Sequence, residues 1–76
     1  MERMRGPAVE ALSSREIDVL KLVARGANNR EIAEQLYITQ ATVKSHLIRI
    51  YGKLDVADRT AAVTKALELR ILRLDS

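Results

Sequence analysis

The sequence contains no cysteine, a single histidine and no aromatic residue other than two tyrosines among its 76 residues. Without cysteine there is no disulfide, no thiolate metal site and no cysteine nucleophile. One imidazole disfavours a dedicated transition-metal cage, because imidazole and thiolate are the usual protein ligands. Two tyrosines are too few for a surface that stacks several bases of a single strand. We therefore expect no metal and no cofactor.

Long hydrophobic runs are missing as well. No apolar stretch approaches the roughly 20 residues of a membrane span, and the N-terminus lacks the apolar core of a signal peptide. We therefore expect a cytoplasmic protein with no membrane partner. The length allows one small domain, because a domain typically takes about 100 residues.

The usual marks of an enzyme are also absent. The sequence has no glycine-rich nucleotide-binding motif, and its only histidine, His46, has no paired nucleophile. The net charge of +3 and the pI near 9.7 favour a polyanionic partner instead. The sequence therefore predicts a binding module and not an enzyme.

The chain divides into a short leading segment and a helical domain. Residues 1–11 are interpreted as a flexible segment or linker, because a helix would not run through Gly6-Pro7. The domain is expected over residues 12–76. Its first helix starts with a capping box of Ser13 and Glu16, and Gly26 is its natural end.

Three further helices follow the first. Asn28 and Glu31 form a second capping box, Thr39 is the next N-cap candidate, and Asp58 caps a fourth helix from about 59 to about 70. The helix over 40–54 has the most regular apolar face, formed by Val43, Leu47, Ile50, Tyr51 and Leu54. No alternating run of β-branched residues predicts a strand, so the predicted fold class is all-α.

Two short helices over about 28–47, joined by about four residues, fit a helix-turn-helix. An ordinary helical hairpin in a small bundle fits the same spacing. Charge favours the first interpretation, because no acidic residue occurs between Glu34 and Asp55, whereas Lys44, Arg49 and Lys53 lie inside that interval. A phosphate backbone is a partner that explains a stretch with charges of one sign.

The outward face of helix 40–54 carries side chains suited to the major groove. Ala41 and Ser45 are small enough for close approach, and Lys44 can reach guanine acceptors or phosphates. Ile48 would contact a thymine methyl or a sugar, although a solitary surface aliphatic is an ordinary alternative. Thr42 and the free amides at the helix start suit a phosphate.

Five motifs occur in a recognisable order: Leu12-Ser13-Ser14-Arg15-Glu16, Val23-Ala24-Arg25-Gly26, Asn29-Arg30-Glu31-Ile32-Ala33, Thr42-Val43-Lys44-Ser45-His46 and Lys53-Leu54. Over about residues 12–70 the chain thereby resembles the LuxR-type, GerE-like DNA-binding domain, which is the effector module of the NarL/FixJ response regulators. The resemblance implies a four-helix bundle whose third helix enters the major groove and whose fourth helix mediates dimerisation.

The resemblance also assigns residues to roles. It places Lys44, Ser45 and Ile48 at base edges, and Arg49 at the margin of that face completes the predicted base contacts. The predicted contacts to the DNA backbone are Asn29, Arg30, Thr39, Gln40, Thr42, His46 and Lys53.

The fourth helix carries a second apolar stripe that one core face does not need. The stripe consists of Thr60, Thr64, Leu67 and Ile71, and we expect it to form a weak homodimer. Alternatively, the stripe packs on Val9 and Leu12 of the leading segment. A dimer would read two half-sites of double-stranded DNA, about one helical turn apart or a multiple of it.

Three residues depart from the local rules. Asp55 and Arg70 stand where relatives often have glycine, so the turn at Asp55 is expected to be strained and the end of the fourth helix is uncertain. Gly52 lies inside the third helix, where it either permits close approach of a backbone or neighbouring chain, or is tolerated drift.

The predicted function is sequence-specific binding of double-stranded DNA by a bacterial transcription regulator. The most common context for this module is the C-terminal effector domain of a two-component response regulator, and RNA polymerase is a further candidate partner. Two alternatives remain: a promoter reader like region 4 of sigma factors, and a helical protein-interaction module with a basic docking helix.

Overall fold

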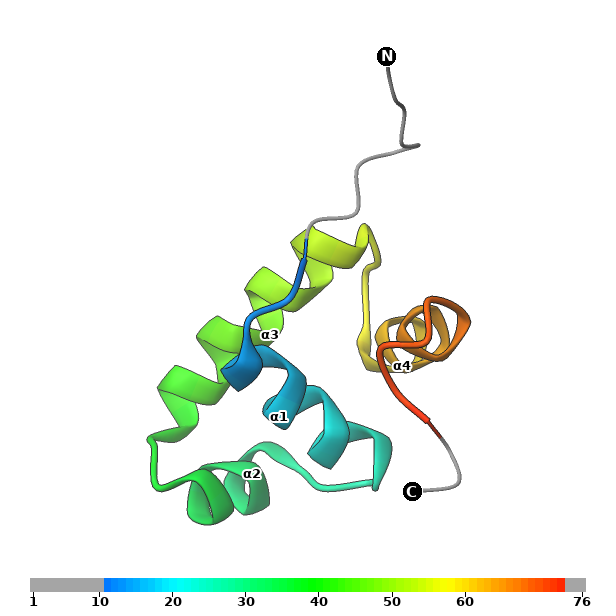
Figure 1. Ribbon diagram of the computed structural model, residues 1–76. Coiled ribbons are helices and arrows are strands. Elements are labelled where there is room, and N and C mark those ends of the chain that lie inside the picture. The colour runs from blue at the N-terminus through cyan, green and yellow to red at the C-terminus, as the bar shows by residue number, and fades with distance from the viewer. Residues whose placement is uncertain (1–10, 74–76) are drawn as a thin grey trace.

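The computed structural model describes residues 11–73, and they form four helices (Figure 1). The helices are α1 (Ser14–Ala24), α2 (Asn29–Leu36), α3 (Gln40–Leu54) and α4 (Arg59–Glu68). Residues 11–73 contain no strand, so the all-α prediction is confirmed. The predicted leading segment 1–11 lies outside the described residues except for Ala11. None of the helices in the described part of the chain is long and apolar enough to cross a membrane.

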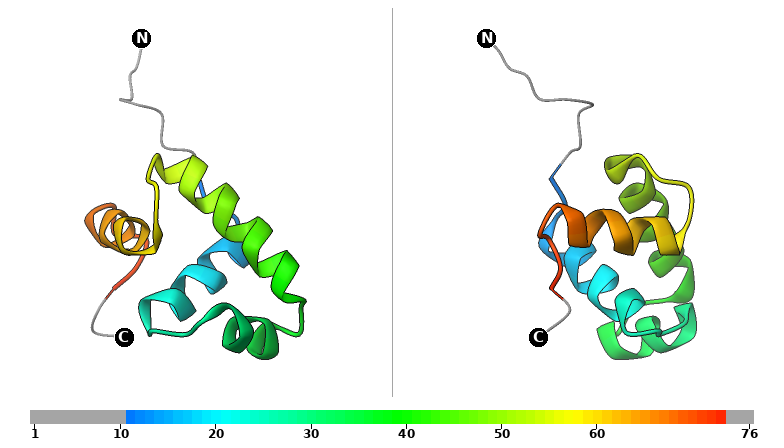
Figure 2. Two further views of the ribbon diagram at one scale, coloured as in Figure 1. Left: turned by 180° about the vertical axis from the view of Figure 1, so that it is seen from behind. Right: turned by 90° about the vertical axis from the view of Figure 1, so that its right-hand side faces the viewer.

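The helices α1 and α3 pack together at the centre, and α2 and α4 each contact both of them. Figure 2 shows from behind that α3 runs along one edge of the molecule, with α2 near its start and α4 beside its second half. Within residues 11–73, α2 and α4 do not pack against each other, although their first residues meet through a hydrogen bond from Arg59 to Asn29. The longest helix therefore has one side against its three neighbours and one side toward solvent.

Local hydrogen bonds start each helix where the sequence predicts. The hydroxyl of Ser13 accepts the N–H of Glu16 at 3.1 Å, and the Glu16 carboxylate accepts the N–H of Ser13 at 2.9 Å. Asn28 and Glu31 form the same reciprocal pair, with both distances 2.9 Å. Both capping boxes are thus confirmed, and each satisfies backbone donors that a helix start leaves open.

The four helix ends share one hydrogen-bond pattern. In each, a backbone N–H just beyond the helix donates to the carbonyl five residues earlier, as Ile38 does to Ala33 at 3.0 Å and Val56 to Tyr51 at 2.9 Å. This pattern needs a left-handed residue immediately before the donor. The donors are all apolar and half-buried against the core: Ala27, Ile38, Val56 and Ile71.

Glycine occupies the left-handed position only after α1, at Gly26. The other three left-handed residues are Tyr37 with φ 58°, Asp55 with φ 58° and Arg70 with φ 62°. The expected strain at Asp55 is confirmed. Because Arg70 takes this conformation, α4 ends at Glu68, two residues before the predicted end. The placement of Ile71 on the fourth helix was therefore wrong, since Ile71 lies in the turn beyond it.

The core lies where α1 and α3 meet their neighbours. The predicted inner face of α3 is buried, apart from Tyr51, which is half-buried. The core consists of Val19, Leu20, Leu22, Val23, Ile32, Ala33, Val43, Leu47, Ile50, Leu54, Ala62, Ala66 and Leu72. Burial of this one side of α3 fixes which residues its other side presents.

Candidate nucleic-acid interface

The outer side of α3 presents all four predicted base-contacting residues to solvent. Lys44, Ser45 and Arg49 are exposed, and Ile48 retains 63% of its possible surface. Gln40 and Ala41 extend the exposed face to the start of the helix. An aliphatic side chain this open contributes little to the core, so its position on the same face as two cations indicates a contact surface.

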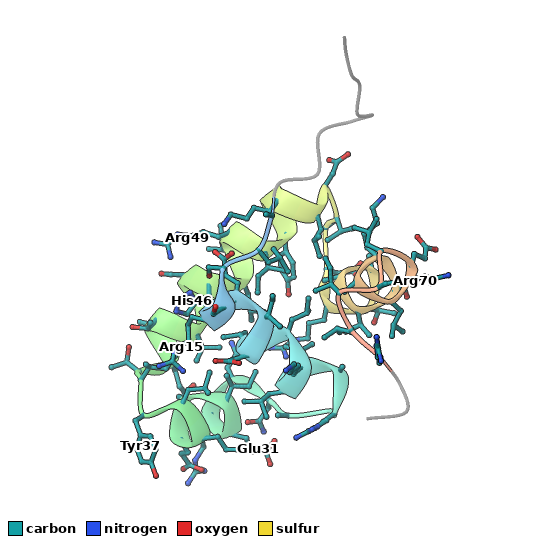
Figure 3. All side chains as sticks on the ribbon, viewed as in Figure 1. Arg15, Glu31, Tyr37, His46, Arg49 and Arg70 are labelled. Carbon is teal, nitrogen blue, oxygen red and sulfur yellow. The ribbon has the colours of Figure 1, made fainter. Side chains whose placement is uncertain are left out.

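The electrostatic character of this face follows from the sequence. No aspartate or glutamate occurs from Gln35 to Leu54, so no carboxylate on α3 offsets its basic side chains. Figure 3 shows Arg49 extending beyond the left-hand edge of the molecule, away from the other helices. A convex helix with exposed cations and no acid attracts a polyanion.

The start of α3 is built around two threonines. The hydroxyl of Thr39 accepts the N–H of Thr42 at 3.0 Å, and the two hydroxyl groups are hydrogen-bonded at 2.9 Å. This satisfies one of the amides that a helix start leaves without an acceptor. The amides ahead of it carry the positive end of the helix dipole, which suits a phosphate oxygen.

His46 lies half-buried on α3, and its two ring nitrogens have different surroundings. The Nδ1 atom is buried and has no hydrogen-bond partner among the described residues. The Nε2 atom is therefore the one that can reach an external group. A phosphate contact by His46, if it forms, uses Nε2.

The two residues of α2 that are predicted to contact the DNA backbone, Asn29 and Arg30, each interact with a neighbouring side chain. Arg30 pairs with Glu34 at 3.4 Å, and both side chains are largely exposed, so the pair is weak and readily exchanged. Arg59 of α4 donates one guanidinium N–H to Oδ1 of Asn29 and another to the carbonyl of Ala27. Because a guanidinium only donates, it fixes which end of the Asn29 amide is the oxygen. The Nδ2 donors of Asn29 then point away from Arg59.

The ammonium of Lys53 has an internal partner that the sequence did not predict. It donates to Oε1 of Glu16 at 2.8 Å, which joins the last turn of α3 to the first turn of α1. The Glu16 side chain is 4% exposed and that of Lys53 is 26% exposed. Lys53 is thus not the free surface cation that its predicted role requires, although its ammonium has further N–H donors.

The same pair perturbs the titration of Glu16. Burial alone would raise the pKa of the Glu16 carboxyl. Hydrogen bonds from Lys53 and from the backbone of Ser13, together with the ammonium charge, outweigh burial and hold this pKa below its ordinary value. The carboxylate is therefore charged at neutral pH. It stabilises both the start of α1, through Ser13, and the contact of α1 with α3, through Lys53.

Tyr37 is an exposed residue whose contribution the sequence did not reveal. It connects α2 to α3, and 94% of its possible surface is open. The spacing of the two helices predicts only a connection of about four residues here and assigns no role to the tyrosine. The pattern that distinguishes it is an aromatic residue between the last core residue of α2 and the N-cap of α3.

The predicted dimer stripe is only partly open in this structure. Thr60 and Thr64 are exposed, whereas Leu67 and Ile71 are half-buried against the core. Leu67 and Ile71 also line a groove of about 360 Å³ between α1 and the end of α4. The other residues lining this groove are Lys21, Ala24, Arg25, Leu72 and Arg73.

Comparison with known proteins finds regulators of bacterial transcription. The transcriptional regulatory protein LiaR of Bacillus subtilis (strain 168) is 51% identical over 57 residues, which cover 75% of this chain and 27% of LiaR. The probable transcriptional regulatory protein NarL of Mycobacterium tuberculosis (strain ATCC 25618 / H37Rv) is 46% identical over 66 residues, 87% of this chain and 31% of NarL. The chain thus spans about a third of the length of the curated relatives it matches.

Solved structures have the same fold. The response regulator ChrA of a heme-sensing two-component system aligns with a TM-score of 0.80 and 46% identity over 92% of this chain and 33% of ChrA. The transcription factor GerE aligns with a TM-score of 0.80 and 34% identity over 84% of this chain and 96% of GerE. Residues 10–66 match the family described as "Bacterial regulatory proteins, luxR family". This chain therefore belongs to the luxR family of bacterial regulatory proteins, a family of transcription regulators and not of enzymes, and has its helix-turn-helix domain.

Proposed function

We propose that this chain binds double-stranded DNA sequence-specifically, with α3 in the major groove. The observation that carries the proposal is the outer face of α3, which is exposed, contains two cations and has no acidic residue, while its inner face is buried. Family membership supports it, because luxR-type helix-turn-helix domains bind DNA. An α-helix fits the major groove of B-DNA, and its outward side chains then meet base edges.

The proposed interface divides into base readers and contacts to the DNA backbone. Lys44 and Arg49 donate to guanine acceptors or phosphates, Ser45 pairs with a base edge, and Ile48 packs on a thymine methyl. The backbone contacts are Asn29, Arg30, Thr39, Gln40, Thr42 and His46. Lys53 shares in them only through N–H donors that are not directed at Glu16.

A weak homodimer through α4 places two copies on adjacent half-sites. Its contacts are Thr60 and Thr64 on the open side of α4, with Leu67 and Ile71 at the edge of the groove. Lys21 and Arg25 of α1 line that groove and are exposed, so apposition of two copies brings like charges together and keeps the dimer weak in the absence of DNA.

The relatives indicate the wider context. The response regulator VraR of Staphylococcus aureus (strain NCTC 8325 / PS 47) is a further relative, and the chain covers about a third of its length. We therefore propose that this chain is the C-terminal effector domain of a cytoplasmic two-component regulator. RNA polymerase is then a further partner on the promoter. The fourth helix, which packs on both α1 and α3, favours this assignment over a sigma-factor region 4.

Selection from a random duplex library tests the proposal. The chain should enrich a defined half-site, and its affinity for the enriched duplex should exceed that for a scrambled duplex. Affinity should fall with salt, with a log–log slope near −0.9 for each phosphate neutralised. Enrichment of no sequence would contradict specific recognition.

Two lysine variants make the test specific to α3. Lys44→Ala should reduce discrimination between the enriched and scrambled duplexes by about 1–3 kcal/mol. Lys65→Ala removes a lysine from α4 that is neither a proposed DNA contact nor a lining residue of the groove, and serves as the control. Equal effects of the two substitutions would mean that net charge, and not α3, determines binding.

A further inference from the structure

The side chain of Tyr37 is the most exposed of the large hydrophobic side chains in the described part of the protein. Its hydroxyl has no hydrogen-bond partner among residues 11–73. Its backbone has φ 58° and ψ 44°, and its N–H donates to the carbonyl of Ala33. The backbone of this residue closes α2, whereas its side chain makes no contribution to the core.

The fold explains the left-handed backbone but not the tyrosine. The turn brings Ile38 back onto the core, and its N–H donates to Ala33, which requires a left-handed residue at position 37. Glycine fills such a position without strain, and asparagine with little. A bulky side chain in this conformation is a genuine outlier. Strained residues of this kind concentrate at binding sites, and the position of Tyr37 just before α3 distinguishes it from Asp55 and Arg70, which bear the same strain.

The position of Tyr37 points to the ligand. Tyr37 lies two residues before Thr39, the N-cap of α3. In Figure 3, Tyr37 extends downward at the lower left, below the start of α3, and Arg49 extends outward from α3 at the upper left. The proposed function places the start of α3, at Thr39 and Gln40, on phosphates that border the groove, so the residue two positions before Thr39 lies close to the same stretch of DNA backbone.

We infer that Tyr37 is a DNA contact, with its hydroxyl donating a hydrogen bond to a phosphate oxygen at the edge of the groove that α3 occupies. The inference rests on the proposed function and adds a residue to the interface. The left-handed backbone directs the ring away from the helices, and the ring is free to pack on the adjacent sugar. Because tyrosine is neutral, this contact displaces no counterion.

Two substitutions at position 37 and one control test the inference. Tyr37→Phe keeps the ring and the backbone but removes the donor, so the thermal midpoint should stay unchanged while affinity falls about tenfold. Tyr37→Gly relieves the backbone, so the midpoint should rise by several degrees while affinity falls at least as far. Stability and affinity then change in opposite directions, which a purely structural role does not produce.

Arg70→Gly is the matched control, because Arg70 is left-handed at the end of α4, on the opposite side of the molecule in Figure 3. It should raise the midpoint without loss of DNA affinity. Salt titration provides a second readout. The slope of affinity against salt should be the same for both position-37 variants as for the parent, whereas Arg30→Ala, which removes a cation from a proposed phosphate contact, should flatten it by about one unit.

The outcomes separate this inference from the proposed function. If Lys44→Ala loses affinity but Tyr37→Phe and Tyr37→Gly bind like the parent, the inference is overturned and DNA binding stands. If the parent enriches no duplex, the proposed function fails first. If Tyr37→Phe retains DNA affinity but loses promoter activity with purified RNA polymerase, Tyr37 faces a protein and the inference is wrong.

Discussion

Replacing Lys53 with methionine keeps the length of its side chain but leaves the carboxylate of Glu16 buried without its cation. The two groups are 2.8 Å apart, and Glu16 is only 4% exposed, so water replaces the ammonium poorly. Breaking a buried pair by removing one partner costs about 3–5 kcal/mol. Because Lys53 is 26% exposed, the lower end of that range applies, and we expect a loss of about 3 kcal/mol in the free energy of unfolding.

For a domain of this size, that loss corresponds to a decrease of about 15 °C in the thermal midpoint. Circular dichroism at 222 nm with heating measures it directly. Lys44→Met is the control, since Lys44 is exposed on the same helix and its removal should change stability by less than about 0.5 kcal/mol. Equal midpoints for the Lys53 and Lys44 variants would refute the assignment of a stabilising pair.

A double variant isolates the interaction itself. Glu16→Gln keeps an oxygen to accept the N–H of Ser13 but removes the buried charge. Combined with Lys53→Met, it should recover at least half of the stability that Lys53→Met loses alone, because no charge is then left buried. Additive losses would show that the two side chains act separately.

The lowered pKa of Glu16 predicts how the free energy of unfolding falls at acid pH. The pKa is lower in the folded chain than the ordinary value of about 4.3. The stabilisation is therefore present above about pH 4.3 and is lost as pH falls through the folded pKa. The parent should lose more stability on acidification than Glu16→Gln, and parallel curves would contradict this cause.

Three further predictions concern single positions. Gly52→Ala should raise stability by up to about 1 kcal/mol, because an added Cβ meets nothing within 4 Å, and should leave DNA affinity unchanged in a duplex titration. Asn29→Asp should preserve the midpoint through an ion pair with Arg59 but lower DNA affinity about tenfold, since a carboxylate replaces donors near phosphate. Sedimentation of the free chain should show self-association that strengthens with salt, because salt screens the repulsion between like charges. Leu67→Asn should abolish this association. A dimer that weakens with salt would exclude the like-charged interface.

The helix starts could be predicted from the sequence because their chemistry is local. The partners of each capping box stand three residues apart, so Ser13 and Glu16 are visible together in the sequence. The inner face of α3 follows for the same reason, since helical periodicity places Val43 and Leu47 one turn apart. The outer face was obtained by elimination once the inner face was assigned.

Contacts between distant segments could not be obtained this way. Lys53 and Glu16 are 37 positions apart, and each already had a sufficient local explanation, as a surface cation and as a cap. Arg59 and Asn29 are 30 positions apart. Only the packing of α1, α3 and α4 brings such groups within hydrogen-bond distance, and the sequence does not specify the angles between helices.

The departures from local rules differ in whether the fold accounts for them. Asp55 and Arg70 adopt strained backbones because the apolar residues that follow them, Val56 and Ile71, return to the core, and any side chain at those two positions would bear the same strain. No such account exists for the side chains of Ile48 and Tyr37, which are open and pack on nothing that stabilises the fold. Both belong to the helix-turn-helix, and a folded chain that retains such exposed side chains there is consistent with a contact surface.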